Sequence, residues 1–130
     1  MKTITISLAL AGLLLIGGTP AASAETVRIR SCWDGDTCTT STGEKIRLAC
    51  LDTPEISGPR ANLATAIPAR DYLRRMVVGR EVGIRRITTD RYARTVAELY
   101  VGNTNVGEEL VRSGHARVYS RYAHQCQWSR

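Results

Sequence analysis

Two short acidic clusters and two arginines form a set with complementary chemistry. The clusters are Asp34-Gly35-Asp36-Thr37 and Asp52-Thr53-Pro54-Glu55; Arg47 lies between them and Arg94 follows. Hard divalent cations prefer carboxylate and carbonyl oxygens as ligands, and guanidinium groups donate paired hydrogen bonds to phosphate oxygens. A further carboxylate can remove a proton from water as a general base. The ordered set therefore points to hydrolysis of a phosphodiester bond.

Alternation of apolar and polar residues, together with turn signals, predicts the elements that hold these side chains. Strands are expected at residues 27–30, 37–42, 45–51, 80–87 and 94–101. One helix is expected near 68–78, with Pro68 in its first turn, and another from Asn105 to Gly114. Whether residues 62–67 extend the first helix stays open. This order predicts an α+β, mainly β fold: a small five-stranded OB-fold-like Greek-key barrel with two covering helices. Trp33 and Trp128 are expected to cover that barrel.

The first 24 residues have the pattern of a secretory signal peptide. Lys2 precedes a largely apolar run over residues 4–16, and Ala22-Ser23-Ala24 matches the small-x-small cleavage site. A membrane anchor is the alternative, but the apolar run is short for a bilayer. We therefore expect cleavage near Ala24, one domain over residues 25–130, and a secreted or periplasmic protein without a membrane anchor.

Basic charge and cysteine content agree with this assignment. The net charge is +6, and loss of residues 1–24 removes only Lys2, which leaves +5; 16 of the 18 basic residues are arginines. Such a surface attracts polyanions. Four cysteines in the predicted mature part fit an oxidising compartment. Of the three possible pairings we favour Cys32–Cys38 with Cys50–Cys126, because the first pair flanks a turn and closes easily.

The motifs, taken in order, resemble the staphylococcal-type thermonuclease family. The resemblance rests on Asp34-Gly35-Asp36-Thr37, on Ile46-Arg47-Leu48 leading to Asp52-Thr53-Pro54-Glu55, on Asp90-x-Tyr92-x-Arg94, and on Leu110-Val111-Arg112-x-Gly114. It covers about residues 27–122. It implies a calcium-dependent nuclease that cleaves DNA and RNA with low sequence specificity and releases 3′-phosphate ends. We expect it to act as a monomer.

The resemblance also implies a role for each site residue. One Ca²⁺ per domain would be held by Asp36, Asp52 and the carbonyl of Thr53. Asp34 is not among these ligands, and we expect it either to shape the turn or to support the ligands from behind. Glu55 would activate the attacking water. Arg47 and Arg94 would stabilise the phosphate. Arg91 and Tyr92 would contact the substrate.

Each residue of the set also has an ordinary explanation, and the chain departs from the family in places. Asp-Gly-Asp is common turn chemistry, and the barrel could be a catalytically inactive OB-fold module that only binds nucleic acid. Such a module gains nothing from three acids, however, because they repel a polyanion unless a cation intervenes.

The chain departs from the family at two positions: Ala93 stands where the family usually has glycine, and Ser120 where the staphylococcal member has a tyrosine. Tyr119 and Tyr122 are expected either in the core or at the rim of the site.

Overall fold

A computed structural model describes residues 12, 17–18 and 24–130; the predicted signal peptide, those few positions apart, lies outside the described residues. The helices are α1 (Leu63–Val77) and α2 (Val106–Arg112), with 3₁₀ turns η1 (Ser120–Gln125) and η2 (Gln127–Ser129) at the C-terminus. The strands are β1 (Thr26–Cys32), β2 (Thr37–Thr40), β3 (Lys45–Leu48), β4 (Leu51–Asp52), β5 (Glu81–Thr89), β6 (Thr95–Val101), β7 (Thr104–Asn105) and β8 (Arg117–Val118).

Five of these strands close into a mixed barrel. The sheet order is β3-β2-β1-β5-β6-β7, and a parallel pairing between β3 and β6 joins its two sides. The other pairings in this sheet are antiparallel, as in hairpins and meanders. The predicted five-stranded barrel with two covering helices is therefore confirmed.

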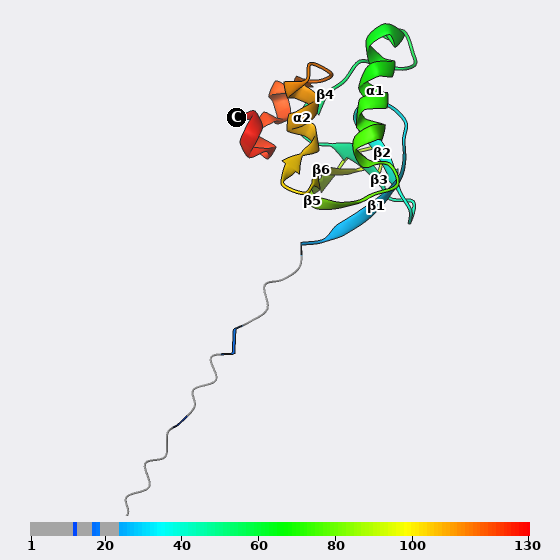
Figure 1. The fold of residues 1–130 in the computed structure, drawn as a ribbon. Helices are drawn as coiled ribbons and strands as arrows, with labels where there is room; N and C mark the ends of the chain where they lie inside the picture. The colour runs from blue at the N-terminus through cyan, green and yellow to red at the C-terminus, as the bar shows by residue number, and fades with distance from the viewer. Residues whose placement is uncertain (1–11, 13–16, 19–23) are drawn as a thin grey trace, which may run out of the picture.

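The two helices lie side by side over one end of the barrel (Figure 1), and a hydrogen bond of 2.7 Å joins Tyr72 Oη of α1 to Glu109 of α2. Helix α1 begins at Leu63, five residues before the predicted start, so Pro68 lies inside it. The proline is tolerated because it is on the exposed side, where water can satisfy the carbonyl that loses its partner. Buried residues recur every three or four positions along α1, at Ala66, Ala69, Leu73 and Val77.

The strand predicted over 45–51 is interrupted, and this is the main correction to the fold. Strand β3 ends at Leu48, and Cys50 takes a left-handed conformation with φ of 72°. The chain then resumes as β4, which pairs with β8 in a separate two-stranded sheet. Leu51 is consequently buried in the same core cluster as Leu48, although strict alternation along one unbroken strand would put the two on opposite faces.

Two disulfides hold this arrangement, in the pairing that the sequence favoured. Cys32–Cys38 joins directly opposite residues of β1 and β2, while Cys50–Cys126 ties the interrupted strand to the C-terminal turns. The backbone N–H of Tyr119 also donates to the carbonyl of Cys50, at 2.9 Å. The tail beyond β8 is thus attached to the barrel next to the break between β3 and β4.

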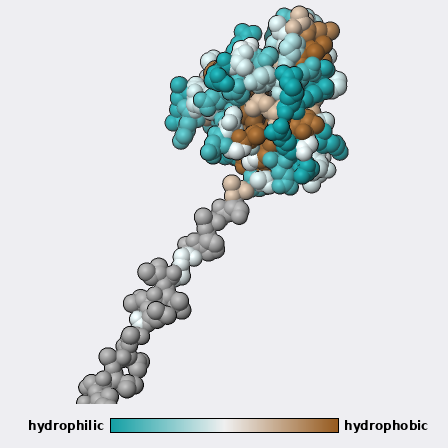
Figure 2. All heavy atoms as spheres, viewed as in Figure 1, coloured by the Kyte–Doolittle hydropathy of each residue, from teal (hydrophilic) through white to brown (hydrophobic). Residues whose placement is uncertain are grey.

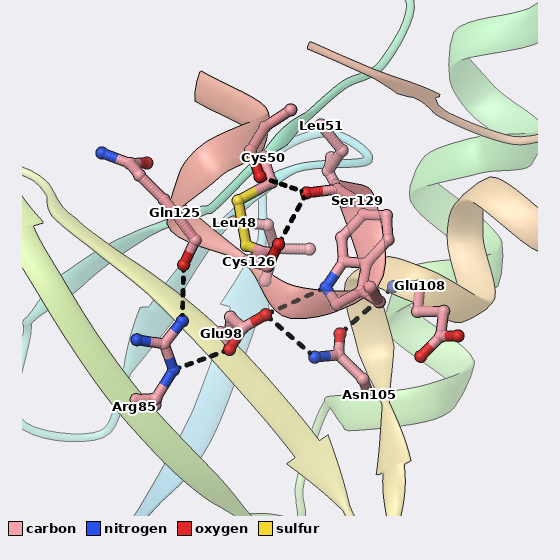
Figure 3. The surroundings of a disulfide bond; sticks show 12 residues. Leu48, Cys50, Leu51, Arg85, Glu98, Asn105, Glu108, Gln125, Cys126 and Ser129 are labelled. Carbon is pink, nitrogen blue, oxygen red and sulfur yellow. Dashed lines mark hydrogen bonds and ion pairs between the residues drawn. A yellow bond between two sulfur atoms is a disulfide. The ribbon is translucent and has the colours of Figure 1, made fainter. Parts of the chain in front are cut away.

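The buried carboxylate of Glu98 holds the end of the same tail by accepting a hydrogen bond from Trp128. Figure 3 shows its surroundings. Glu98 of β6 is 5% exposed and accepts four hydrogen bonds; Figure 3 labels two of the donors, Arg85 and Asn105. The donors are Arg85 Nε at 2.7 Å, Tyr100 Oη at 2.8 Å, Trp128 Nε1 at 2.9 Å and Asn105 Nδ2 at 3.1 Å. Burial alone would raise the pKa of Glu98, but these donors and the charge of Arg85 lower it below its usual range.

Most of the visible surface is hydrophilic, with apolar side chains gathered in a few small areas (Figure 2). Among the described residues, no helix combines the length and the apolar character needed to cross a membrane. The two disulfides indicate an oxidising, extracytoplasmic environment.

Candidate active site

The loop between β1 and β2 presents the first acidic cluster. Gly35 is required there by close packing: a Cβ at this position would lie 2.9 Å from Thr53 Cγ2 and 3.0 Å from Ala69 Cβ. Asp34 Oδ1 accepts the backbone N–H of Asp36 at 3.1 Å, so Asp34 shapes the turn. Burial and the neighbouring negative Asp36 raise the pKa of Asp34 to about 7. Because Gly35 has no side chain, the loop can lie directly against Thr53 of the second acidic cluster and Ala69 of α1.

Asp36 is almost fully buried, and its carboxylate is held by Thr53. Asp36 Oδ2 accepts from Thr53 Oγ1 at 2.9 Å and from the Thr53 backbone N–H at 3.3 Å, while Oδ1 accepts from Thr37 Oγ1 at 3.1 Å. A buried carboxylate is costly unless its oxygens are bonded. These donors therefore keep Asp36 in one orientation at the junction of both clusters.

The guanidinium of Arg47 lies between the two aspartates. Its Nη2 is 3.4 Å from Asp36 Oδ2 and 3.5 Å from Asp52 Oδ1. Its Nη1 donates to the carbonyls of Leu48 and Leu51, at 2.8 and 3.0 Å. The turn at the break between β3 and β4 therefore wraps around this guanidinium and fixes it.

Asp36 and Asp52 offer oxygen atoms of the kind that a hard divalent cation prefers. The two carboxylate oxygens approach one nitrogen atom, so they lie no farther apart than the sum of those two distances. The Asp52 side chain is 45% exposed, which leaves it free lone pairs. Among the described residues no group of three or more His, Cys, Asp or Glu side chains forms a metal cluster. A cation here would thus depend on Asp36 and Asp52 plus carbonyl oxygen or water, as calcium sites allow.

Arg94 is positioned by a tight turn between β5 and β6. Asp90 accepts the Arg94 backbone N–H at 3.0 Å and Arg94 Nε at 2.8 Å, and Arg94 Nη1 reaches Thr37 Oγ1 at 3.4 Å. Burial alone would raise the pKa of Asp90, but these bonds and the Arg94 charge lower it. Thr37 pairs with Arg47 across β2 and β3. The structure therefore brings both predicted phosphate-binding arginines to one strand residue.

Tyr92 and Arg91, at the tip of the same turn, are exposed and stacked together. Arg91 lies 4.9 Å from the centre of the Tyr92 ring and Arg94 lies 5.3 Å from it, and Arg91 Nη2 donates to Tyr92 Oη at 2.7 Å. Cations over an aromatic face are attracted by its quadrupole. The two predicted substrate contacts thus form one accessible unit next to Arg94.

Ala93 completes this turn in a left-handed conformation, with φ of 60°. A residue with a Cβ pays about 1–2 kcal/mol for that region, although glycine loses more chain entropy on folding. The turn geometry is thus retained without glycine, at a cost in stability.

We expect Ala93→Gly to raise the free energy of unfolding by up to about 1 kcal/mol, because it relieves that strain. Urea unfolding with an unchanged slope would measure the gain. Ala64→Gly, at a helical position of α1, should lower stability instead. Equal effects of the two substitutions would contradict the strain at Ala93.

A cleft of about 560 Å³ lies between the barrel and the C-terminal tail, and Arg47 and Arg94 are among the residues that line it. Arg47, Arg91, Tyr92 and Arg94 line one part of it. The opposite wall comes from the tail, through Tyr119, Arg121, Tyr122 and Gln125. Tyr119 and Tyr122 are therefore rim residues. Arg121 and Gln125 were not predicted, although Tyr119, Tyr122 and Cys126, their neighbours in the sequence, could have drawn attention to them.

Glu55 is the predicted site residue that the structure does not connect to the others. It is exposed, in the loop between β4 and α1, and its carboxylate makes no hydrogen bond or ion pair with the described residues. Its backbone is nonetheless fixed, because the Glu55 carbonyl accepts the N–H of Asn62 at 2.9 Å and Glu55 bridges Ala61. The carboxylate is therefore free to meet water or substrate three residues beyond Asp52.

Sequence relationships agree with this geometry. The chain is 35% identical over 118 residues to an uncharacterised endonuclease of Haemophilus influenzae, covering 86% of this chain and 64% of that protein. It is 31% identical over 99 residues to an uncharacterised endonuclease of Escherichia coli O157:H7, covering 73% of this chain and 61% of that protein. The chain thus spans somewhat less than two thirds of the length of these relatives.

A plant relative is the staphylococcal-like nuclease CAN1 of Arabidopsis thaliana, 31% identical over 87 residues, covering 65% of this chain and 25% of that protein. The model of the family described as staphylococcal nuclease homologue matches residues 45–129, which include Arg47, Asp52, Glu55 and Arg94. The chain therefore belongs to the staphylococcal nuclease homologue family.

Proposed function

We propose that this protein is a calcium-dependent nuclease that hydrolyses phosphodiester bonds of DNA and RNA with low sequence specificity. The observation that carries the proposal is the position of Arg47, which contacts both Asp36 and Asp52 and also lines the cleft with Arg94. A phosphate group in that cleft would meet two guanidiniums beside a pair of acids. The names of the endonuclease relatives support the same reaction class.

The two arginines bind and stabilise the phosphate. Attack on phosphorus increases negative charge on the nonbridging oxygens, and donors already aimed at that position stabilise the transition state more than the ground state. Asp90 holds Arg94 in a single orientation, and the carbonyls of Leu48 and Leu51 do the same for Arg47. Little reorganisation is then needed when the charge develops.

Asp36, Asp52 and the carbonyl of Thr53 are the groups that would hold calcium. When bound, the ion supplies a positive charge that offsets the acids and polarises a phosphate oxygen. Thr53 contributes in a second way, since its hydroxyl and N–H keep the Asp36 carboxylate oriented.

Glu55 accepts the proton of the attacking water. An exposed, unpaired carboxylate on a fixed loop backbone suits this role, because a general base must reach the water that it deprotonates. Arg91 and Tyr92 contact the substrate beside Arg94, through charge and through the ring face. As the oxygen of the attacking water bonds to phosphorus, the bond from phosphorus to the 5′ oxygen breaks, solvent protonates that oxygen, and a 3′-phosphate remains.

The protein acts outside the cytoplasm, as a monomer, after removal of residues 1–24. Two disulfides support an oxidising location. The excess of arginine supports attraction to nucleic acid, with an affinity that falls as salt is raised.

A direct test is incubation of the oxidised protein with single-stranded DNA and with RNA, in calcium and in EGTA. We expect cleavage of both in calcium and almost none in EGTA, because the single positive charge of Arg47 does not offset two acids beside a phosphate. Full activity of metal-free protein would contradict the calcium site. Binding without any cleavage in calcium would instead identify an OB-fold module that binds nucleic acid.

A further inference from the structure

Trp33 is the most exposed large apolar side chain of the described residues. Its exposure is 65%, whereas Trp128 packs against the core and donates its indole N–H to Glu98. The expectation that both tryptophans cover the barrel is therefore right for Trp128 and wrong for Trp33. The indole of Trp33 extends into solvent from the loop that carries Asp36.

The fold makes little use of this indole. The disulfide Cys32–Cys38 fixes the loop on either side of Trp33. The Trp33 backbone N–H donates to the Thr37 carbonyl at 2.9 Å, and Arg74 Nε donates to the Cys32 carbonyl at 2.9 Å. All three restraints act on the backbone or on neighbours, so they hold the loop whatever side chain occupies position 33.

The position of Trp33 relates it to the candidate site. Thr37, which accepts the backbone bond of Trp33, also contacts Arg94 through its side chain and pairs with Arg47. Trp33 is not among the residues that line the cleft, but one backbone bond joins it to Thr37, the strand residue that both proposed phosphate-binding arginines reach. Arg74, an exposed cation, lies next to it at Cys32.

We propose that Trp33 is a substrate-binding residue that stacks on an unpaired base of a single-stranded nucleic acid, next to the phosphate held by Arg47 and Arg94. This inference rests on the proposed nuclease function. An aromatic side chain on a rigid loop loses little entropy on binding, and every base offers a face for stacking, so the contact adds affinity without sequence preference. A duplex hides its base faces and gains nothing from it.

The test compares Trp33→Ala with Leu63→Ala, a matched control at an apolar side chain that is 52% exposed at the start of α1. Affinity for a short single-stranded DNA in calcium is measured in a Glu55→Gln background, where cleavage is slow. Stacking of one base contributes about 1–3 kcal/mol, so Trp33→Ala should bind about 5- to 140-fold more weakly. Leu63→Ala should change affinity less than about 2-fold.

Two further readouts separate stacking from a structural role. Bound DNA should quench the tryptophan emission of the protein, and Trp33→Ala should lose that quenching. Trp33→Tyr should restore most of the affinity, because it also offers a ring face. Melting temperatures of all variants should stay within a few degrees of the unsubstituted protein, since no core contact is lost.

The outcomes distinguish this inference from the proposed function. Unchanged affinity of Trp33→Ala, in a protein that binds and cuts DNA, overturns the role of Trp33 and leaves the nuclease function standing. An equal loss of affinity for duplex DNA also overturns it, because duplex bases cannot stack on the indole. A protein that neither binds nor cuts nucleic acid rejects the proposed function and this inference together.

Discussion

We expect Glu55→Gln to slow phosphodiester cleavage about 10²- to 10⁴-fold, the usual contribution of a general base. Glutamine keeps the size of the side chain but cannot accept the proton of the attacking water at neutral pH. The substitution should leave the fold intact, because the Glu55 carboxylate has no partner among the described residues and its backbone bonds remain. Single-turnover cleavage of a labelled oligonucleotide, beside a binding assay, measures the two effects separately.

A matched control exists on the barrel. Glu81, the first residue of β5, is also exposed, and its side chain makes no ion pair with the described residues. Glu81→Gln removes the same charge and should change the cleavage rate less than about 2-fold. If both variants slow cleavage by the same small factor, the effect is one of net charge. The general-base role of Glu55 would then be rejected.

Local patterns were sufficient for the regular parts of the fold. Strands β1, β2, β5 and β6 start and end within about two residues of the positions that alternation predicts. Helix α2 begins as predicted, because Asn105 Oδ1 accepts the Glu108 N–H at 3.1 Å and caps the first turn. These features are decided by neighbours in sequence, which is why the sequence alone predicts them.

Features that depend on distant residues were not predictable in the same way. The break at Cys50 exists because its disulfide partner and the Tyr119 N–H come from a tail some seventy residues away. Glu98 likewise appears as an ordinary strand residue in the sequence. Only the fold gathers Arg85, Asn105 and Trp128 around it.

The candidate site likewise has residues that short motifs predict and residues that only distant contacts bring to the site. Its acids and arginines belong to short motifs, so their types and spacing could be recognised. Arg121 and Gln125 of the tail wall could not, because they reach the cleft only through the pairing of β4 with β8 and through Cys50–Cys126. Trp33 was misassigned because tryptophan is usually buried, and only the structure shows where the loop directs it.

The second large effect concerns stability, and we expect it from the disulfide that holds the tail. Cys50→Ala combined with Cys126→Ala should lower the free energy of unfolding by about 4 kcal/mol. The reason is that the closed loop is long, with a sequence separation of 76 residues, and the unfolded chain regains the entropy of that loop. Urea unfolding of the oxidised proteins, compared at one pH and salt concentration, measures the difference.

The other disulfide supplies a control that isolates loop length. All four cysteines are buried, at most 4% exposed, so replacing either pair with alanine removes similar packing. Cys32–Cys38 closes a separation of only 6 residues, for which loop entropy predicts a loss of about 2 kcal/mol. The pair with the long loop should therefore cost about twice as much. Equal losses would mean that local packing at the sulfur atoms, and not restraint of the tail, accounts for the stabilisation. The tail with Tyr119 and Tyr122 would then need to be held against the cleft chiefly by Glu98 and by β8.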